Sequence, residues 1–173
     1  MVMCDRKIAQ GTGDIAVEPA MTQEQCLRAI LAGIEVVADL STQGYEMIGM
    51  GEMGIGNTTP SSALVSVLLN LPAEEVTGRG AGLSDASYNK KVAVIEQAVK
   101  RYWKATEDSE IPDGPFFKID AAVELMSHLG GYEIAAMAGM CLGGAVFGVP
   151  IVLDGYISVA GALCASLINA DCT

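Results

Sequence analysis

The residues best suited to chemistry lie in one short segment, residues 51–59, which reads GEMGIGNTT. The segment combines a carboxylate, Glu52, with glycines at 51, 54 and 56, and it follows an apolar run from Tyr45 to Met50. Pro60 and an apolar helical pattern come next, so the order predicts a strand, a tight loop and a helix. We expect Pro60 to occupy the first helical position and Thr59 to cap the helix.

The start of such a helix can bind an anion. Its unpaired backbone N–H groups and the positive end of the helix dipole attract negative charge, and glycines allow a phosphate to approach the backbone. A carboxylate and an anion-binding backbone would then share one loop. The alternative is an ordinary strand-to-helix turn that binds nothing, and the pattern alone leaves both interpretations open.

Helices and strands alternate around this loop. Helical patterns cover residues 22–41, 60–70, 120–129, 132–147 and 156–169, and another one follows the glycine-rich stretch 78–82 and continues through Tyr102. Apolar strands are predicted over 45–50 and 149–153, and continuous apolar strands are typical of parallel sheets covered on both faces. We therefore expect an α/β domain with a Rossmann-like parallel sheet flanked by helices in three layers, α/β/α. Residues 105–118 are polar and rich in turn formers, which indicates a surface excursion.

Three loops are candidates for a ligand site because ligands of parallel sheets bind beyond the carboxyl ends of the strands. They are residues 51–59, 78–82 and 154–155. We expect these loops to converge, which favours a ligand site over an ordinary turn. Within them, Arg79 is also typical of a surface ion pair and Asp154 of a simple turn.

Composition limits the possible functions. The chain has 173 residues, of which 51% are hydrophobic and 18% charged, which suits one domain with a buried core. A formal net charge of −11 argues against a nucleic-acid partner, because phosphate backbones require clustered Lys and Arg. The longest apolar region, 134–170, is interrupted by glycines, Pro150 and Asp154, so no membrane partner is expected.

The cysteines and the single histidine indicate the cellular compartment and exclude one class of metal site. Five cysteines, without CxxC spacing and without a signal-peptide pattern before them, favour reduced thiols in the cytoplasm. The single histidine, His128, excludes a multi-histidine metal site.

Four linked motifs resemble those of one enzyme family. In chain order they are GTGDIAVEPAMT, EMGIGNTTPSSAL, EEVTGRGAGLSD and GGYEIAAMAGMCLGGAVFGVPIVLDGYI, which begin at residues 11, 52, 74 and 130. Together they resemble the nicotinate-nucleotide–dimethylbenzimidazole phosphoribosyltransferases of cobalamin biosynthesis. The resemblance covers nearly the whole chain in the right order.

The resemblance implies transfer of the 5-phosphoribosyl group of nicotinate mononucleotide to 5,6-dimethylbenzimidazole, which yields α-ribazole 5′-phosphate and nicotinate. Nicotinate mononucleotide carries a pyridinium-like leaving group, so the enzyme mainly positions the incoming nitrogen and removes its other proton. No metal or other cofactor is implied. Two alternatives remain: a non-catalytic nucleotide-binding fragment, and a related transferase that uses adenine or a phenol as the acceptor.

The resemblance also assigns site residues. It implies a supporting catalytic role for Glu52 near the nicotinate and the ribose. The residues implied around the nucleotide are Gly54, Ile55, Gly56, Asn57, Thr58 and Thr59, and those of a second loop near the 5′-phosphate are Gly80, Ala81 and Gly82. Lys91 is expected to reach this phosphate, with Lys90 as the alternative. At the end of the second strand, Asp154 and Gly155 complete the expected substrate-binding residues.

Parts of the family pattern do not occur in this sequence. The resemblance implies an N-terminal segment that contributes to the benzimidazole pocket and a C-terminal glutamate, in a GEGTGA-like motif, that acts as general base. We therefore expect residues 1–173 to form one nucleotide-binding α/β core domain that lacks both segments. Apolar surface left exposed in this way would favour association, and we expect a homodimer.

Overall fold

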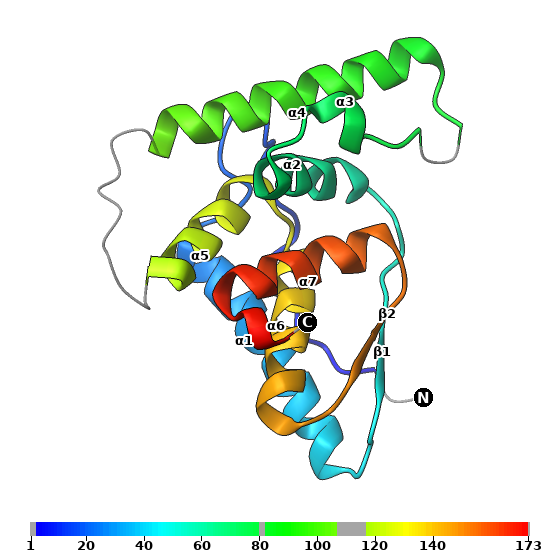
Figure 1. Ribbon diagram of the computed structural model, residues 1–173, viewed down its shortest axis with the longest axis vertical. Coiled ribbons are helices and arrows are strands. Elements are labelled where there is room, and N and C mark those ends of the chain that lie inside the picture. Colours follow the sequence, from blue (N-terminus) through cyan, green and yellow to red (C-terminus); the bar gives the residue numbers. More distant parts are fainter. Residues whose placement is uncertain (1–2, 80–81, 107–116, 173) are drawn as a thin grey trace.

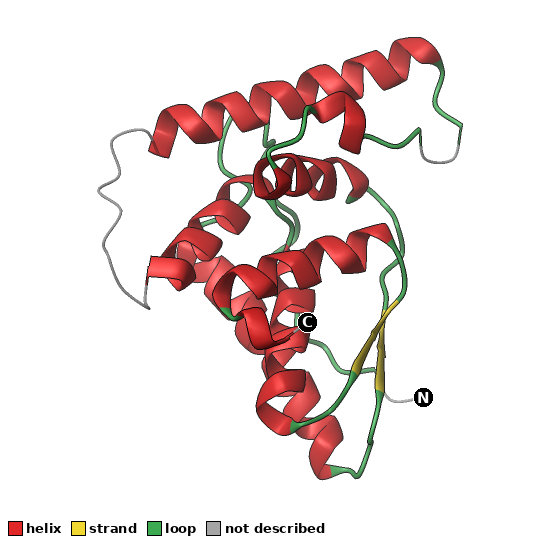
Figure 2. Cartoon of the chain, in the orientation of Figure 1, coloured by secondary structure: helices red, strands yellow, loops and turns green. Residues whose placement is uncertain are grey.

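The computed structural model of the protein describes residues 3–79, 82–106 and 117–172. Along these ranges the chain forms α1 (Gln23–Thr42), β1 (Ile48–Met50), α2 (Thr58–Leu69), α3 (Ala73–Val76), α4 (Asp85–Thr106), α5 (Phe117–Leu129), α6 (Tyr132–Phe147), β2 (Ile151–Leu153), α7 (Tyr156–Ile168) and a short 3₁₀ helix, η1 (Ala170–Cys172) (Figure 1). The described part of the chain is mostly helical, with its two strands side by side at one flank (Figure 2).

β1 and β2 pair in parallel, with Ile48 opposite Ile151 and Met50 opposite Leu153. The parallel pairing of the two predicted strands is therefore confirmed, although each is only three residues long. The described residues form a sheet of these two strands, and the predicted three-layer α/β/α arrangement is not seen among them. The physical reason is that the other apolar segments have helical periodicity, so most of the core forms where helices pack on helices.

Most helices lie where the apolar spacing predicts them. The capping box at the start of α1 is present: Gln25 N donates to Thr22 Oγ1 at 3.1 Å, and Thr22 N donates to Gln25 Oε1 at 2.9 Å. The short helix α3, which follows Pro72, was not predicted. α4 continues to Thr106 and α5 begins at Phe117, so the part of the predicted surface excursion that lies between them falls outside the described residues.

α1 and α6 form the most extensive helix pair, and glycines allow their close approach. A methyl group on Gly33 would lie 1.9 Å from the carbonyl oxygen of Ala136, and one on Gly139 would lie 2.0 Å from that of Ile30. Both contacts are with backbone atoms, which cannot move aside as a flexible side chain would. The two glycines therefore set the distance between the helices.

One hydrophobic core connects the helices. Its fully buried members include Leu64 of α2, Ile95 of α4, Met126 and Leu129 of α5, and Ile134 of α6. These side chains come from elements spread over the chain, so the core fixes how α2, α4 and α6 sit relative to one another.

Arg101 of α4 ties the N-terminal segment to α5. Its Nε donates to the Ile15 carbonyl at 3.2 Å, its Nη2 donates to the His128 carbonyl at 3.0 Å, and its Nη1 lies 3.3 Å from His128 Nδ1. Burial and the positive charge of Arg101 lower the pKa of His128. The single histidine is therefore part of a structural contact that is disfavoured when the ring becomes charged.

Candidate functional site

The site begins where the two strands end. Gly51 follows β1 and Asp154 follows β2, and a methyl group on Gly51 would lie 3.6 Å from Cβ of Asp154. The loops 51–57 and 154–155 are thus neighbours at the carboxyl edge of the sheet, as predicted. The chain leaves this edge into the starts of α2 and α7, which face the same flank of the molecule (Figure 1).

The loop after β1 folds around the carboxylate of Glu52. Glu52 Oε2 accepts hydrogen bonds from the backbone N–H of Gly54 and, at 2.6 Å, from Nδ2 of Asn57. Gly54 and Gly56 have φ values of +71° and +76°, a region that favours glycine. Ile55 between them is 79% exposed, so its side chain adds apolar surface rather than core. The predicted glycines are therefore needed for the turn that brings Glu52 and Asn57 together.

α2 begins two residues earlier than predicted. Asn57 is the residue before the helix, Thr58 is its first residue, and Pro60 is therefore third rather than first. Thr59 lies inside the helix and does not cap it, so this prediction was wrong. Proline is tolerated here because the N–H groups of the first helical turn have no acceptor within the helix. The half-buried Thr58 and Thr59 of this first turn lie next to the glycine loop, and their N–H groups have no acceptor within the helix.

Lys91 reaches this helix start from α4. Its Nζ donates to Oγ1 of Thr58 at 3.0 Å and to the Gly78 carbonyl at 3.4 Å. The ammonium group thus joins the start of α2 to the beginning of the second glycine-rich loop, two segments far apart in sequence. Burial lowers the pKa of Lys91.

A cavity of about 360 Å³ opens beside Lys91. Its lining residues are Thr58, Thr59, Leu83, Ser87, Lys90, Lys91 and Val94. Of the second loop, Gly82 is exposed with φ +97°, while Gly80 and Ala81 fall outside the described residues. The structure therefore brings Thr58, Thr59 and Lys91 together as predicted, and Lys90 shares their cavity.

Ser87 was not among the predicted site residues. It lies four residues before Lys91 on α4, and side chains four residues apart share one face of a helix. Leu83 was also not predicted, and it lines the cavity from the turn before α4. The helical spacing from Lys91 could have identified Ser87, whereas nothing in the local sequence distinguishes Leu83.

Arg79, beside the second loop, is already paired. Its Nη1 lies 2.6 Å from Oδ1 of Asp85, and its guanidinium lies 4.7 Å from the ring centre of Tyr88. The predicted surface ion pair is confirmed. Both charged side chains of the pair are largely exposed, so the contact adds little stability.

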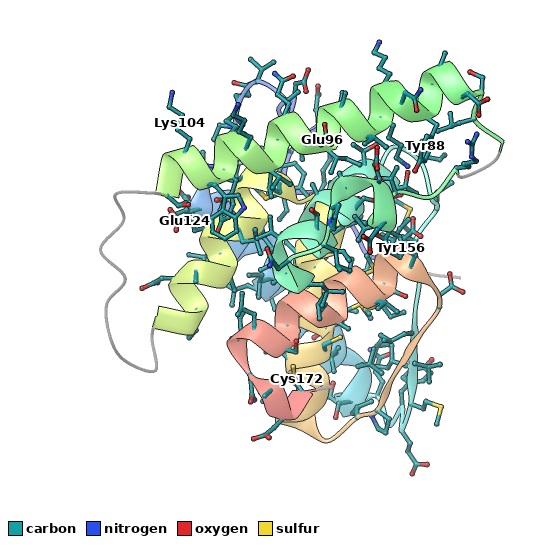
Figure 3. The ribbon with its side chains drawn as sticks, turned by 45° about the horizontal axis from the view of Figure 1, so that its top comes forward. Tyr88, Glu96, Lys104, Glu124, Tyr156 and Cys172 are labelled. Carbon is teal, nitrogen blue, oxygen red and sulfur yellow. The ribbon has the colours of Figure 1, made fainter. Side chains whose placement is uncertain are left out.

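Two tyrosines hold the segment that leads to the second loop. Tyr156, the first residue of α7, donates to the Val76 carbonyl at 2.9 Å and lies 3.3 Å from Ser62 Oγ. Tyr88 of α4 donates to the Glu74 carbonyl at 3.2 Å. The two rings therefore approach the short helix α3 from different elements (Figure 3). Neither was predicted, because a single tyrosine at a helix start carries no distinctive local pattern.

Asp154 and Gly155 form the turn into α7. Their backbone N–H groups donate to Ser158 Oγ at 3.0 and 2.9 Å, which secures the start of the helix. The Asp154 side chain is exposed beside Gly51, at the same edge as Glu52. Its position allows a ligand contact, which stays a prediction.

A family model described as phosphoribosyltransferase matches residues 1–173. The chain belongs to this family. The match confirms the resemblance seen in the four sequence motifs.

Named relatives agree with the family match. The chain is 45% identical over 165 residues to the nicotinate-nucleotide–dimethylbenzimidazole phosphoribosyltransferase of Chlorobium chlorochromatii, covering 95% of this chain and 42% of that protein. The enzyme of the same name from Clostridium perfringens is 39% identical over 165 residues, with the same coverage of 95% and 42%.

A solved structure extends the similarity to three dimensions. The crystal structure of CobT from Thermus thermophilus superposes with a TM-score of 0.83 at 37% identity, covering 98% of this chain and 46% of that one. The chain thus spans about two fifths of the length of the curated relatives it matches. In the described parts of the chain, no helix is long and apolar enough to cross a membrane.

Proposed function

We propose that this chain supplies the nucleotide-binding part of an enzyme that transfers the 5-phosphoribosyl group of nicotinate mononucleotide to 5,6-dimethylbenzimidazole, giving α-ribazole 5′-phosphate and nicotinate. One observation carries the proposal. Lys91 meets the start of α2 at Thr58, next to a loop that presents the Glu52 carboxylate. An anion site and an acidic group therefore adjoin, as a phosphorylated ribose requires.

The 5′-phosphate would bind between Lys91 and the first turn of α2. The N–H groups of Thr58 and Thr59 offer donors without acceptors in the helix, and the helix dipole favours an anion there. Lys91 would exchange its contacts with Thr58 Oγ1 and the Gly78 carbonyl for phosphate oxygens. Lys90 and Ser87 line the same cavity and could add further donors.

The chemistry at C1′ needs only modest help. A nitrogen of dimethylbenzimidazole forms a bond to C1′ while the bond from C1′ to the nicotinate nitrogen breaks, and the bonding electrons return to the pyridine ring. The other nitrogen of the benzimidazole loses its proton to a base. Attack from the face opposite nicotinate inverts C1′. Glu52 would support this step electrostatically, because positive charge develops on the ribose as the leaving group departs.

The proposal is tested by calorimetric titration with nicotinate mononucleotide, followed by product analysis with dimethylbenzimidazole, adenine and a phenol. We expect binding in a one-to-one ratio. Formation of α-ribazole 5′-phosphate with the first base would show that a residue of this chain, Glu52 first, can act as the base. Failure to bind the nucleotide would refute the site. Binding without any product is the result expected if residues 1–173 provide only the nucleotide-binding part. Product formed with adenine or a phenol, but not with dimethylbenzimidazole, would identify a different acceptor.

The wider assignments remain part of the proposal. We propose that residues 1–173 act as one nucleotide-binding domain, with β1 and β2 belonging to the parallel sheet of a three-layer α/β/α arrangement. All five cysteines are free, which supports a cytoplasmic setting. Exposed apolar side chains such as Val146 and Val152, 71% and 49% exposed, support association into a homodimer. Light scattering during size-exclusion chromatography tests the last point, and a monomer would refute it.

A further inference from the structure

Asn57 precedes α2, but its side chain does not cap the helix. It immediately precedes α2 and is only 5% exposed. Asparagine is favoured there because its side-chain oxygen can accept a hydrogen bond from the first helical turn. The Asn57 side chain makes no such capping bond. Its amide nitrogen instead donates to Oε2 of Glu52 at 2.6 Å.

This choice leaves the other end of the amide unsatisfied. Oδ1 of Asn57 is buried and has no hydrogen-bond partner. A buried acceptor without a donor is destabilising, because it has given up its hydrogen bonds to water and gained none in the protein. A 180° flip of the Asn57 side-chain amide would not help. It would place Oδ1 of Asn57 against Oε2 of Glu52, two acceptors, and leave the buried Nδ2 without an acceptor. The observed orientation is the one that gives the carboxylate a donor.

Glu52 is consequently held through one of its two oxygens. The N–H of Gly54 also donates to Oε2, so both donors converge on the same atom. Among the described residues, no hydrogen bond engages Oε1. Oε2 thus accepts hydrogen bonds from the loop, and Oε1 can still accept hydrogen bonds from a ligand.

We propose that Asn57 is a positioning residue that acts through Glu52: it holds Oε2 so that Oε1 faces the ribose of the bound nucleotide. The inference rests on the proposed function and specifies one part of it. It replaces the expectation from sequence that Asn57 contacts the nucleotide itself. The unsatisfied Oδ1 is then the cost of orienting a functional carboxylate.

Thermal unfolding tests this role without any ligand. Asn57→Leu keeps the approximate size of the side chain but removes both the donor and the unsatisfied acceptor. We expect it to melt no lower than the wild type, and to raise the melting temperature more in a Glu52→Ala background, where the amide has lost its acceptor. Asn57→Ala, too small to overpack the site, separates a steric clash from a polar effect. Asn89→Leu, an exposed asparagine of α4, is the matched control.

The melting comparison has a clear contrary outcome. If Asn57 supports the fold directly, both Asn57 variants will melt more than about 4 °C below the wild type, a loss of roughly 1–2 kcal/mol for a domain of this size. Equal effects of Asn57→Leu with and without Glu52 would also overturn the proposal, because the two side chains would then be uncoupled.

Calorimetric titration with nicotinate mononucleotide supplies the functional measurement. We expect Asn57→Leu and Glu52→Ala each to weaken binding about five- to tenfold, and the double variant to bind within about twofold of Glu52→Ala. Multiplied losses, or wild-type affinity in Asn57→Leu, would overturn the positioning role. If the wild type itself fails to bind, the proposed function fails, while the melting comparison still decides whether the amide serves Glu52.

Discussion

Replacing Lys91 with methionine tests the phosphate site most directly. The variant keeps most of the apolar stem but removes the ammonium that contacts Thr58 Oγ1 at 3.0 Å and the Gly78 carbonyl at 3.4 Å. A hydrogen bond to a charged group is worth about 1.5–3 kcal/mol, and exchanging the existing contacts for phosphate offsets about 1 kcal/mol of it. The net loss of about 0.5–2 kcal/mol corresponds to roughly 2- to 30-fold weaker binding.

The assay compares two ligands that differ only in the phosphate. Calorimetry with nicotinate mononucleotide should show the full loss in Lys91→Met, whereas nicotinate riboside should bind wild type and variant alike. Lys90→Met tests whether the neighbouring lysine binds the phosphate instead. Lys100→Met, on an exposed part of α4, controls for the loss of one positive charge. An equal loss with both ligands, or a larger loss in Lys90→Met, would refute the assignment of Lys91 to the phosphate.

The same site has a predictable response to pH. Burial lowers the pKa of Lys91 in the free protein, so the folded chain releases this proton at lower pH than the unfolded chain. The protonated form is the one that pairs with phosphate. Affinity should therefore fall as the pH rises through the lowered pKa of Lys91, before an ordinary lysine would titrate, and this fall should vanish in Lys91→Met.

Four further predictions address catalysis, the loop and the fold. Glu52→Gln keeps an acceptor oxygen but loses the charge, so any turnover should drop at least about tenfold while the Kd for nicotinate mononucleotide changes less than about threefold; equal losses would contradict its role. Gly56→Val should abolish nucleotide binding, because the added side chain would fill the open space beside the loop that the ligand is expected to occupy. Gly148→Val is the control: its φ of +68° is close to the +76° of Gly56 and its surroundings are equally open, so it should lower the melting temperature as much as Gly56→Val does and still bind the nucleotide. Gly139→Ala should lower the unfolding free energy by about 2–3 kcal/mol or more in urea titrations, because the new methyl meets the Ile30 backbone, and stability like the wild type would argue against the α1–α6 packing. The pKa of His128 is lowered in the fold, so stability should be lost as the pH falls below about 6.5, where the unfolded ring takes up a proton first. Melting curves of His128→Gln should show a weaker decline over that range, and an unchanged decline would mean that other groups cause it.

Local sequence patterns predicted those features that depend on neighbours along the chain. The Thr22 capping box, the bounds of α6 and the need for glycine at 54 and 56 follow from backbone geometry within a few residues. The start of α2 was misplaced because Thr58, Thr59 and Pro60 are all compatible with a first helical turn. In the structure the helix begins at Thr58, and the amide of the preceding Asn57 turns toward Glu52 rather than toward the helix.

The sequence by itself determined the order of the longer helices and the two strands, the glycine loop and its carboxylate, and the family to which the chain belongs. The spacing of apolar residues predicts which face of a helix is buried, but not which other element that face packs against. Only the tertiary structure decided that Lys91 meets Thr58, that Tyr156 donates to the Val76 carbonyl, and that the Asn57 amide donates to Glu52 while its buried oxygen has no partner. The first two contacts join groups from different elements, and their distances are fixed by the packing of the shared helical core. The third lies within the loop 51–57, where it depends on the burial of Asn57.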